Sequence, residues 1–411
     1  MNSPEKNLAK NTFFLYLMQI ANYVFPLLTF PYLTRVLGAE KYGVVVFGNA
    51  VMSYFGLFLE FGFILSATNL CSQYREDKEK LGNITFGVIY AKVILAVLGA
   101  IVLILCCNYS AVFKVQKQFF YLYYIGTALN IFLPDYLFRG IEKMSILTYR
   151  VLFSKFVYTA LVFGLIHNSE DYCFVPVATI GGAVISVLLT WLDILRKKYI
   201  SLTRISINDS LSYMKDASAF FISRIAVSMY TTLNTVLLGL KFPNAELALY
   251  GTANNLTNMC RTMISPISDS IYPYMVKNKN FKLVKKLIFI FEPVIIAGCI
   301  LLYFIAPFVI RIVCGEGYDG AVPVLRSMLP LIVISLPTYL CGYPVLGALG
   351  KIKIANISVI FGSIFHIIGL FVLYFVGYMS FISVSLLTFA TEIIVFSIRC
   401  KTIIKNILRK I

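Results

Sequence analysis

The chain has 411 residues, of which 59% are hydrophobic and only 13% are charged, and its mean hydropathy is +0.82. Soluble proteins carry about 25% charged residues, so this composition excludes an ordinary soluble domain. A net charge of +17 would suggest nucleic acid in a soluble chain, but here it indicates basic loops on the cytoplasmic side of a membrane. We therefore expect an all-α integral membrane protein with no nucleic-acid partner.

Apolar runs follow one another at a regular pace and predict about twelve transmembrane helices, because about 20 apolar residues cross a bilayer. The predicted helices cover residues 12–34, 43–66, 84–106, 118–139, 151–167, 174–194, 216–239, 248–272, 287–313, 323–348, 354–376 and 381–398. The fifth and the last are short, so a count of ten or eleven stays open.

Lysine and arginine residues predict the orientation of these helices. With the N-terminus inside, the inner segments collect 25 basic residues, Arg150 and Arg399 among them, and the outer segments collect six. Because cytoplasmic loops carry the excess of basic residues, we expect both termini in the cytoplasm. The first apolar run lacks a small-residue cleavage site, which favours an uncleaved first helix over a signal peptide.

A polar interval in the middle of the chain divides the predicted helices into six and six. We expect an N-terminal six-helix lobe, a cytoplasmic connector and a C-terminal six-helix lobe, at 1–195, 196–215 and 216–411. The first helix of each half is expected to be followed by a short outer loop that ends in a Tyr-Gly pair, at Tyr42–Gly43 and Tyr250–Gly251. The first of these loops is a charged, glycine-containing turn of nine residues, 35–43. A repeat with an even number of spans keeps its orientation, so an axis along the membrane normal would relate the halves.

Polar residues recur at spacings of three and four along several predicted helices, which places them on one helical face. Hydrocarbon cannot satisfy their hydrogen bonds, so these faces are expected to line an internal cavity between the halves. The first two helices and the eighth contribute the candidates Tyr16, Gln19, Tyr23, Asn49, Ser53, Asn254, Asn258 and Ser265.

Three cations lie inside predicted spans: Lys92, Arg224 and Arg261. Placing an unpaired cation in a bilayer costs about 2.5 kcal/mol or more. We therefore expect each of these side chains either to serve a function or to be paired with an acid. The functional interpretation is a cationic wall for an anionic head group, because guanidinium grips phosphate in a fork. The alternatives are snorkelling toward the cytoplasm and structural ion pairs with Asp216, Asp269 or Glu292.

Acidic residues in or near the spans are the candidates for coupling transport to H⁺ or Na⁺, namely Glu60, Asp216, Asp269 and Glu392. His366 is a candidate proton relay, although a hydrogen-bonded packing role is the expected one. The nine cysteines show no CxxC pair or metal-like spacing, so neither a metal site nor a disulfide framework is predicted. No cofactor is expected beyond a coupling ion.

The opening stretch, NTFFLYLMQIANYVFPLLTFPYLTRVLGAEKYGVVVFGNAVMSYFGLFLEFGF (11–63), resembles the O-antigen and polysaccharide-unit flippases of the Wzx type. The similar features are Asn-Tyr-x-x-Pro, the Pro-Tyr-Leu-x-Arg-Val-Leu-Gly turn with Tyr-Gly, and Glu-Phe-Gly-Phe. Beyond this stretch the resemblance rests on twelve spans in two halves. These flippases belong to a wider exporter superfamily that includes lipid II flippases and MATE drug antiporters.

The resemblance implies a MATE-like, V-shaped exporter fold that works by alternating access. It implies an undecaprenyl-pyrophosphate-linked oligosaccharide as substrate, moved from the cytoplasmic to the periplasmic leaflet. It also implies membrane lipids and other polysaccharide-assembly proteins as partners, and the bacterial plasma (inner) membrane as the location. The family has no fixed catalytic signature to transfer.

Two other function classes stay open. A cation-coupled antiporter of small molecules would favour an acidic cavity, because its substrates are usually cationic, and the arginines argue against it. A membrane-embedded polysaccharide polymerase or glycosyltransferase would need a large outer loop or a cytosolic catalytic domain, and the sequence shows neither. The expected protein is therefore a transporter and not an enzyme.

Overall fold

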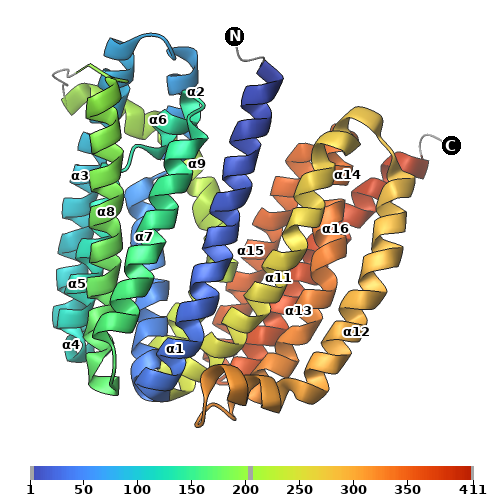
Figure 1. Ribbon diagram of the computed structural model, residues 1–411. Helices are drawn as coiled ribbons and strands as arrows, with labels where there is room; N and C mark the ends of the chain where they lie inside the picture. Colours follow the sequence, from blue (N-terminus) through green and yellow to red (C-terminus); the bar gives the residue numbers. More distant parts are fainter. Residues whose placement is uncertain (1–3, 202–206, 409–411) are drawn as a thin grey trace. The chain divides into compact units, whose positions relative to one another are not determined.

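The computed structural model describes residues 4–201 and 207–408, and within them the chain is almost entirely helical (Figure 1). The chain divides into two compact units, residues 1–225 and residues 226–411. The boundary lies inside α9 (Ile207–Thr231), 10 residues beyond the end of the predicted connector at 196–215. Part of that connector, residues 202–206, lies outside the described residues, and the predicted lobe limits stay a prediction.

Unit 1 begins with the long helix α1 (Pro4–Glu60), whose two limbs run in opposite directions on either side of a sharp break (Figure 1). The remaining helices of unit 1 are α2 (Phe63–Gln73), α3 (Lys78–Tyr109), α4 (Ala111–Val115), α5 (Lys117–Leu129), η1 (Asn130–Phe132), α6 (Asp135–Gly140), α7 (Met144–Leu165), η2 (Ser169–Cys173) and α8 (Phe174–Lys197). Helix α7 packs against α1 and α8, and α5 packs against α8.

Unit 2 contains the rest of the helices, drawn from yellow to red in Figure 1. They are α10 (Leu233–Lys241), α11 (Asn244–Asn278), α12 (Phe281–Cys314), α13 (Ala321–Cys341), α14 (Tyr343–Ala348), α15 (Ile352–Phe375) and α16 (Phe381–Leu408). Helix α13 lies at the centre of this unit, because it packs against α11, α12 and α16.

Eight segments of the described chain are long and apolar enough to cross a membrane. The first, Asn11–Gln73, contains both limbs of α1 and therefore the first two predicted spans. The other seven segments correspond to seven further predicted spans. Among these, the fifth predicted span is α7, with 22 residues, and the twelfth is α16, with 28, so neither is short. The chain is an all-α, multi-pass membrane protein.

The three other predicted spans are helical but fall outside that set, for two reasons. The spans at 118–139 and 216–239 are broken into shorter helices, by η1 and Leu133 in the first and at Thr232 in the second. The span at 248–272 lies in α11, which is long enough but carries too many polar side chains.

The predicted turns at the two Tyr-Gly pairs need correction. Tyr42 and Gly43 lie within α1, and Tyr250 and Gly251 lie within α11. The first reversal depends on one residue, Gly38, whose φ of 66° and ψ of 173° are accessible only to glycine. The charged stretch around it is helical, so the reversal needs no outer loop.

Candidate functional site

Unit 1 contains a cavity of about 310 Å³ with four charged residues in its wall. They are Glu60 from the end of α1, Lys92 from α3, Asp135 from the start of α6 and Arg150 from α7. We call this space the Lys92 cavity. The sequence therefore brings together two carboxylates and two cations from four helices in the interior of one unit.

The fourth predicted span is broken where it supplies Asp135. Proline lacks a backbone N–H and disfavours a helical residue before it, and Leu133, which precedes Pro134, is extended with φ −96° and ψ 105°. Helix α6 then starts afresh at Asp135. The break thus places this carboxylate at a helix N-terminus, where negative charge is favourable.

Each carboxylate of the Lys92 cavity has its own cation. Both Nη atoms of Arg150 donate to Asp135, in the two-pronged geometry that guanidinium and carboxylate favour, with Nη2–Oδ2 at 3.0 Å. Arg224 of α9 donates to Glu60 with Nη1–Oε2 at 2.5 Å. Glu60 also accepts from the backbone N–H groups of Gly62 and Ile64, so it caps α2 as well.

Lys92 is 6% exposed, and within the described residues its ammonium group has no ion-pair partner within 4.0 Å. It lies over the ring of Tyr136 at 5.6 Å and near that of Phe63 at 6.0 Å, which gives it cation–π contacts. A buried cation without a carboxylate partner is unusual inside a membrane protein and marks a functional-site candidate.

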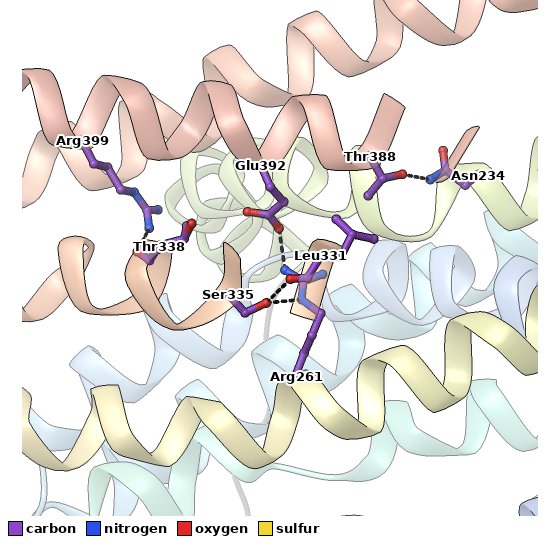
Figure 2. A network of polar contacts seen from close by, with 8 residues as sticks. All are labelled: Asn234, Arg261, Leu331, Ser335, Thr338, Thr388, Glu392 and Arg399. Carbon is purple, nitrogen blue, oxygen red and sulfur yellow. Dashed lines mark hydrogen bonds and ion pairs between the residues drawn. The ribbon is translucent and has the colours of Figure 1, made fainter. Parts of the chain in front are cut away.

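Unit 2 contains a second polar group, centred on Arg261 of α11. Its Nε donates to Ser335 Oγ of α13 at 2.8 Å, and its Nη2 donates to Glu392 Oε1 of α16 at 2.5 Å (Figure 2). The exposed fractions of the Arg261 and Glu392 side chains are 15% and 5%, so the pair is largely buried. We call these three residues the Arg261 network.

A small cavity of about 50 Å³ adjoins the Arg261 network, and Asn254 and Asn258 of the predicted stripe line it together with Asn234. Asn234 of α10 donates to Thr388 Oγ1 at 3.0 Å (Figure 2) and faces His366 Nε2 through its Oδ1 at 2.8 Å. The other ring nitrogen of His366 is 2.8 Å from Thr391 Oγ1. His366 therefore has the hydrogen-bonded packing position that the sequence predicts.

Arg399 of α16 is buried as well, although its place near the C-terminus suggested a cytoplasmic loop residue. Its Nη1 donates to the carbonyl of Thr338 at 2.7 Å, as Figure 2 shows. Its Nε donates to Ser358 Oγ at 3.0 Å. Nη2 adds a contact with the carbonyl of Ala355 at 3.4 Å. This arginine ties α16 to α13 and α15, so its role is structural.

The suggested partners of the two arginines were wrong. Arg224 pairs with Glu60 and Arg261 with Glu392, whereas the sequence pointed to Asp216, Asp269 or Glu292. The true partners are 164 and 131 residues away along the chain. Neither arginine therefore offers an unneutralised charge to a ligand.

The other predicted site residues lie outside these two groups. On the first limb of α1, Gln19 donates to the hydroxyl of Tyr23, one turn further, and Tyr16 is exposed. On the second limb, Asn49 accepts from the hydroxyl of Tyr123, and Ser53 donates to the carbonyl of Asn49 at 2.7 Å.

Three predicted residues lie apart from both groups. Ser265 Oγ donates to the carbonyl of Thr262 in its own helix at 3.2 Å. Asp216 on α9 and Asp269 on α11 are exposed, and neither lines the Lys92 cavity or the small cavity of unit 2. Their proposed role in ion coupling stays a prediction.

Two members of the Lys92 cavity were not predicted as site residues. Asp135 was not among the candidate acids, and Arg150 was counted among the basic residues of the inner segments. The available signal was Pro134, because a proline followed by an acid marks a new helix start that can face inward. Arg150 carries no such local signal. Among the described residues, no three His, Cys, Asp or Glu side chains form a cluster that could hold a metal ion.

The family model described as "Polysaccharide biosynthesis protein" matches residues 8–279, about two thirds of the chain. The chain belongs to this family. The match contains the whole Lys92 cavity and also Arg261, whereas Glu392 and Arg399 lie beyond it.

Two curated relatives carry the name "Putative O-antigen transporter". The one from Escherichia coli (strain K12) is 28% identical over 337 residues, which are 80% of this chain and 81% of the relative. The one from Shigella dysenteriae is 28% identical over 377 residues, 90% of this chain and 93% of the relative. Both relatives are thus named as transporters, the class expected for this chain, and neither is named as an enzyme.

Solved structures of transporters share the fold. An inward-facing MATE family transporter of the MOP superfamily aligns with a TM-score of 0.71 and 15% identity over 93% of this chain and 94% of that one. Lipid II flippase MurJ aligns with a TM-score of 0.68 and 14% identity over 97% and 89%. At these identities the likeness establishes the fold alone.

Proposed function

We propose that the protein is a flippase for a lipid-linked oligosaccharide, the repeat unit of an O-antigen or another surface polysaccharide. The main support is the family match over residues 8–279, because that family is described by its part in polysaccharide biosynthesis. The relatives named as O-antigen transporters and the fold shared with a lipid II flippase support it. The substrate would be the undecaprenyl-pyrophosphate-linked unit, moved from the cytoplasmic to the periplasmic leaflet of the inner membrane.

Alternating access would require polar residues that can exchange partners inside the membrane. The Arg261 network and the Glu60–Arg224 pair are the candidates, because each is an ion pair between helices of one unit. A proton or Na⁺ arriving at Glu60 or Glu392 would release the paired arginine, and this is how we propose that transport is driven. Both termini would lie in the cytoplasm, as the distribution of basic residues indicates.

The test uses a strain that lacks its own O-antigen flippase and a plasmid that encodes this chain. Surface polysaccharide should return, and lipid-linked oligosaccharide should stop accumulating on the cytoplasmic leaflet. Purified protein in proteoliposomes should then move a fluorescent lipid-linked oligosaccharide between leaflets. Export of cationic drugs without movement of the lipid-linked sugar would favour the small-molecule antiporter instead.

A further inference from the structure

Unit 2 contains a large apolar groove that is separate from the Arg261 network. It has a volume of about 740 Å³ and lies between α12 and α13, with Phe389 of α16 also in its wall. Helix α12 lies at the edge of unit 2 (Figure 1), and only 11% of its apolar stretch is buried. Two of the lining residues are charged, Glu292 and Arg326, and most of the others are apolar. We call this space the α12 groove.

The length of the α12 groove matches one leaflet of a bilayer. Its α12 wall runs from Glu292 to Phe304, which is about 18 Å at about 1.5 Å per residue. The hydrocarbon of one leaflet is about 15 Å thick, which is half of about 30 Å. A lipid acyl chain therefore fits the groove in length, whereas an undecaprenyl chain is far too long for it.

Arg326 is held at one end of the groove because of a proline in the neighbouring helix. Pro307 has no backbone N–H, so it cannot donate to the carbonyl of Tyr303, four residues earlier, as another helical residue would. Arg326 Nε donates to that carbonyl at 3.0 Å, and its guanidinium lies 4.5 Å from the centre of the Tyr303 ring. These two contacts hold the arginine side chain against α12.

The positive charge of Arg326 is not neutralised within the described part of the chain. No carboxylate there lies within 4.0 Å of its guanidinium. Glu292, the acid of the groove, is about 16 Å from Tyr303 along α12, near the other end. An unpaired cation in a membrane is costly, and the two Nη groups have the forked geometry that binds phosphate.

We propose that the α12 groove binds one phospholipid of the periplasmic leaflet, with its phosphate on Arg326 and an acyl chain between α12 and α13. The leaflet follows from the proposed orientation, because Arg326 is less than two turns from Ala321, the periplasmic start of α13. The inference goes beyond the proposed function and does not depend on which molecule the protein transports.

The experiment titrates the purified full-length protein in detergent with phosphatidylglycerol and with diacylglycerol of the same acyl chains. Native mass spectrometry measures the two affinities. The wild type should bind phosphatidylglycerol at least tenfold more tightly, because only this lipid carries the phosphate.

Arg326→Gln alone leaves the Tyr303 carbonyl without its donor, so the informative variant is Arg326→Gln combined with Pro307→Ala. Alanine restores the helical N–H to that carbonyl. The double variant should keep the wild-type unfolding temperature and bind the two lipids with affinities within twofold of each other. Val333→Trp, which fills the groove, should weaken both lipids. Arg311→Gln is the matched control, because Arg311 is also on α12 but is 71% exposed and does not line the groove.

Equal affinity of the wild type for both lipids would overturn the inference. An unchanged preference for phosphatidylglycerol in the folded double variant would do the same. Displacement of phosphatidylglycerol by an equal concentration of lipid-linked oligosaccharide would assign the groove to the transported substrate and would also overturn the proposal.

Discussion

The arginines of this protein show why a charge in a membrane helix cannot be interpreted alone. Arg261 looked like part of a cationic wall, but it is joined to Glu392, which is 5% exposed. Breaking a buried pair leaves the remaining charge without compensation, which costs about 3–5 kcal/mol. The side chain therefore contributes to stability as well as to any transport step.

Replacing Arg261 by alanine should accordingly lower the amount of folded protein and its thermal unfolding temperature in detergent. The double variant Arg261→Met with Glu392→Leu should recover most of that stability, because it removes both charges together. If transport stays absent in this stable double variant, the pair has a role in function. A single Arg261→Ala variant as stable as the wild type would contradict the buried pair.

Arg399 gives a second prediction at this scale. Arg399→Lys keeps the charge but cannot reach Ser358 and the carbonyl of Thr338 together, so at least one buried acceptor loses its donor. The expected cost is about 1–3 kcal/mol, measured by thermal or denaturant unfolding. Lys401→Gln, on the exposed side of the same helix, should change little.

The sequence predicted which helices carry polar residues, but it could not predict their partners. Glu60 lies 164 residues before Arg224, and the choice among several acids depends on helix packing. His366 was easier, because one histidine within an apolar run is expected to be hydrogen-bonded. Lys92 is buried, as its place inside a predicted span suggests, and its role as a site residue stays a prediction. Arg150 was hidden among the basic residues near helix ends.

At the scale of elements, the junction between α1 and α2 depends on a single glycine. Gly62 has a φ of 80°, and a Cβ there would lie 2.8 Å from the backbone N of Phe221 and 2.9 Å from the carbonyl oxygen of Ala217. Both contacts are with the backbone of α9, which cannot move aside cheaply. The junction also positions Glu60, whose carboxylate accepts from Gly62 N–H.

Gly62→Ala should therefore destabilise unit 1 by more than the roughly 1 kcal/mol of left-handed strain alone, and it should weaken the Glu60–Arg224 pair. Thermal unfolding in detergent measures the loss. The matched control is Gly164→Ala in α7, where nothing lies within 4 Å of the new methyl group and helix propensity favours alanine. Equal effects of the two substitutions would exclude the contact with α9.

Element boundaries were predicted where apolar length decides them and missed where one residue does. The break at Pro134 was missed, because residues 118–139 were predicted as one helix, although proline disfavours a helical Leu133. The reversal at Gly38 looked like a charged loop of nine residues, because Arg35, Glu40 and Lys41 resemble solvent-exposed turn residues. Two helices that meet at one glycine can carry the same charged residues as a solvent-exposed loop, so the sequence alone does not distinguish them.

For the molecule as a whole, the distribution of basic residues predicts the side of the membrane that each connection faces. Helix α12 runs from Phe281 to Cys314, so its two ends should be accessible from opposite sides. In a cysteine-free background, Lys282→Cys should react with an impermeant maleimide only from the cytoplasmic side. Glu316→Cys should react from the periplasmic side of spheroplasts.

Labelling of both positions from one side would show that α12 does not span the membrane. Exchange of the two sides would reverse the proposed orientation while keeping the fold. Each position is exposed, so reactivity depends on the side of the membrane and not on burial.

Helix α11 has a consequence for how the chain is made. It is 35 residues long, carries Asn254, Asn258, Arg261 and Asp269, and does not meet the apolar requirement that α12 meets. A translocon selects segments by their own partitioning, and an arginine at a helix centre opposes insertion. Glu392, the partner of Arg261, is synthesised 131 residues later. Insertion of α11 should therefore stay incomplete until α13 and α16 have been synthesised. The helices of this unit should then insert and pack together rather than one at a time.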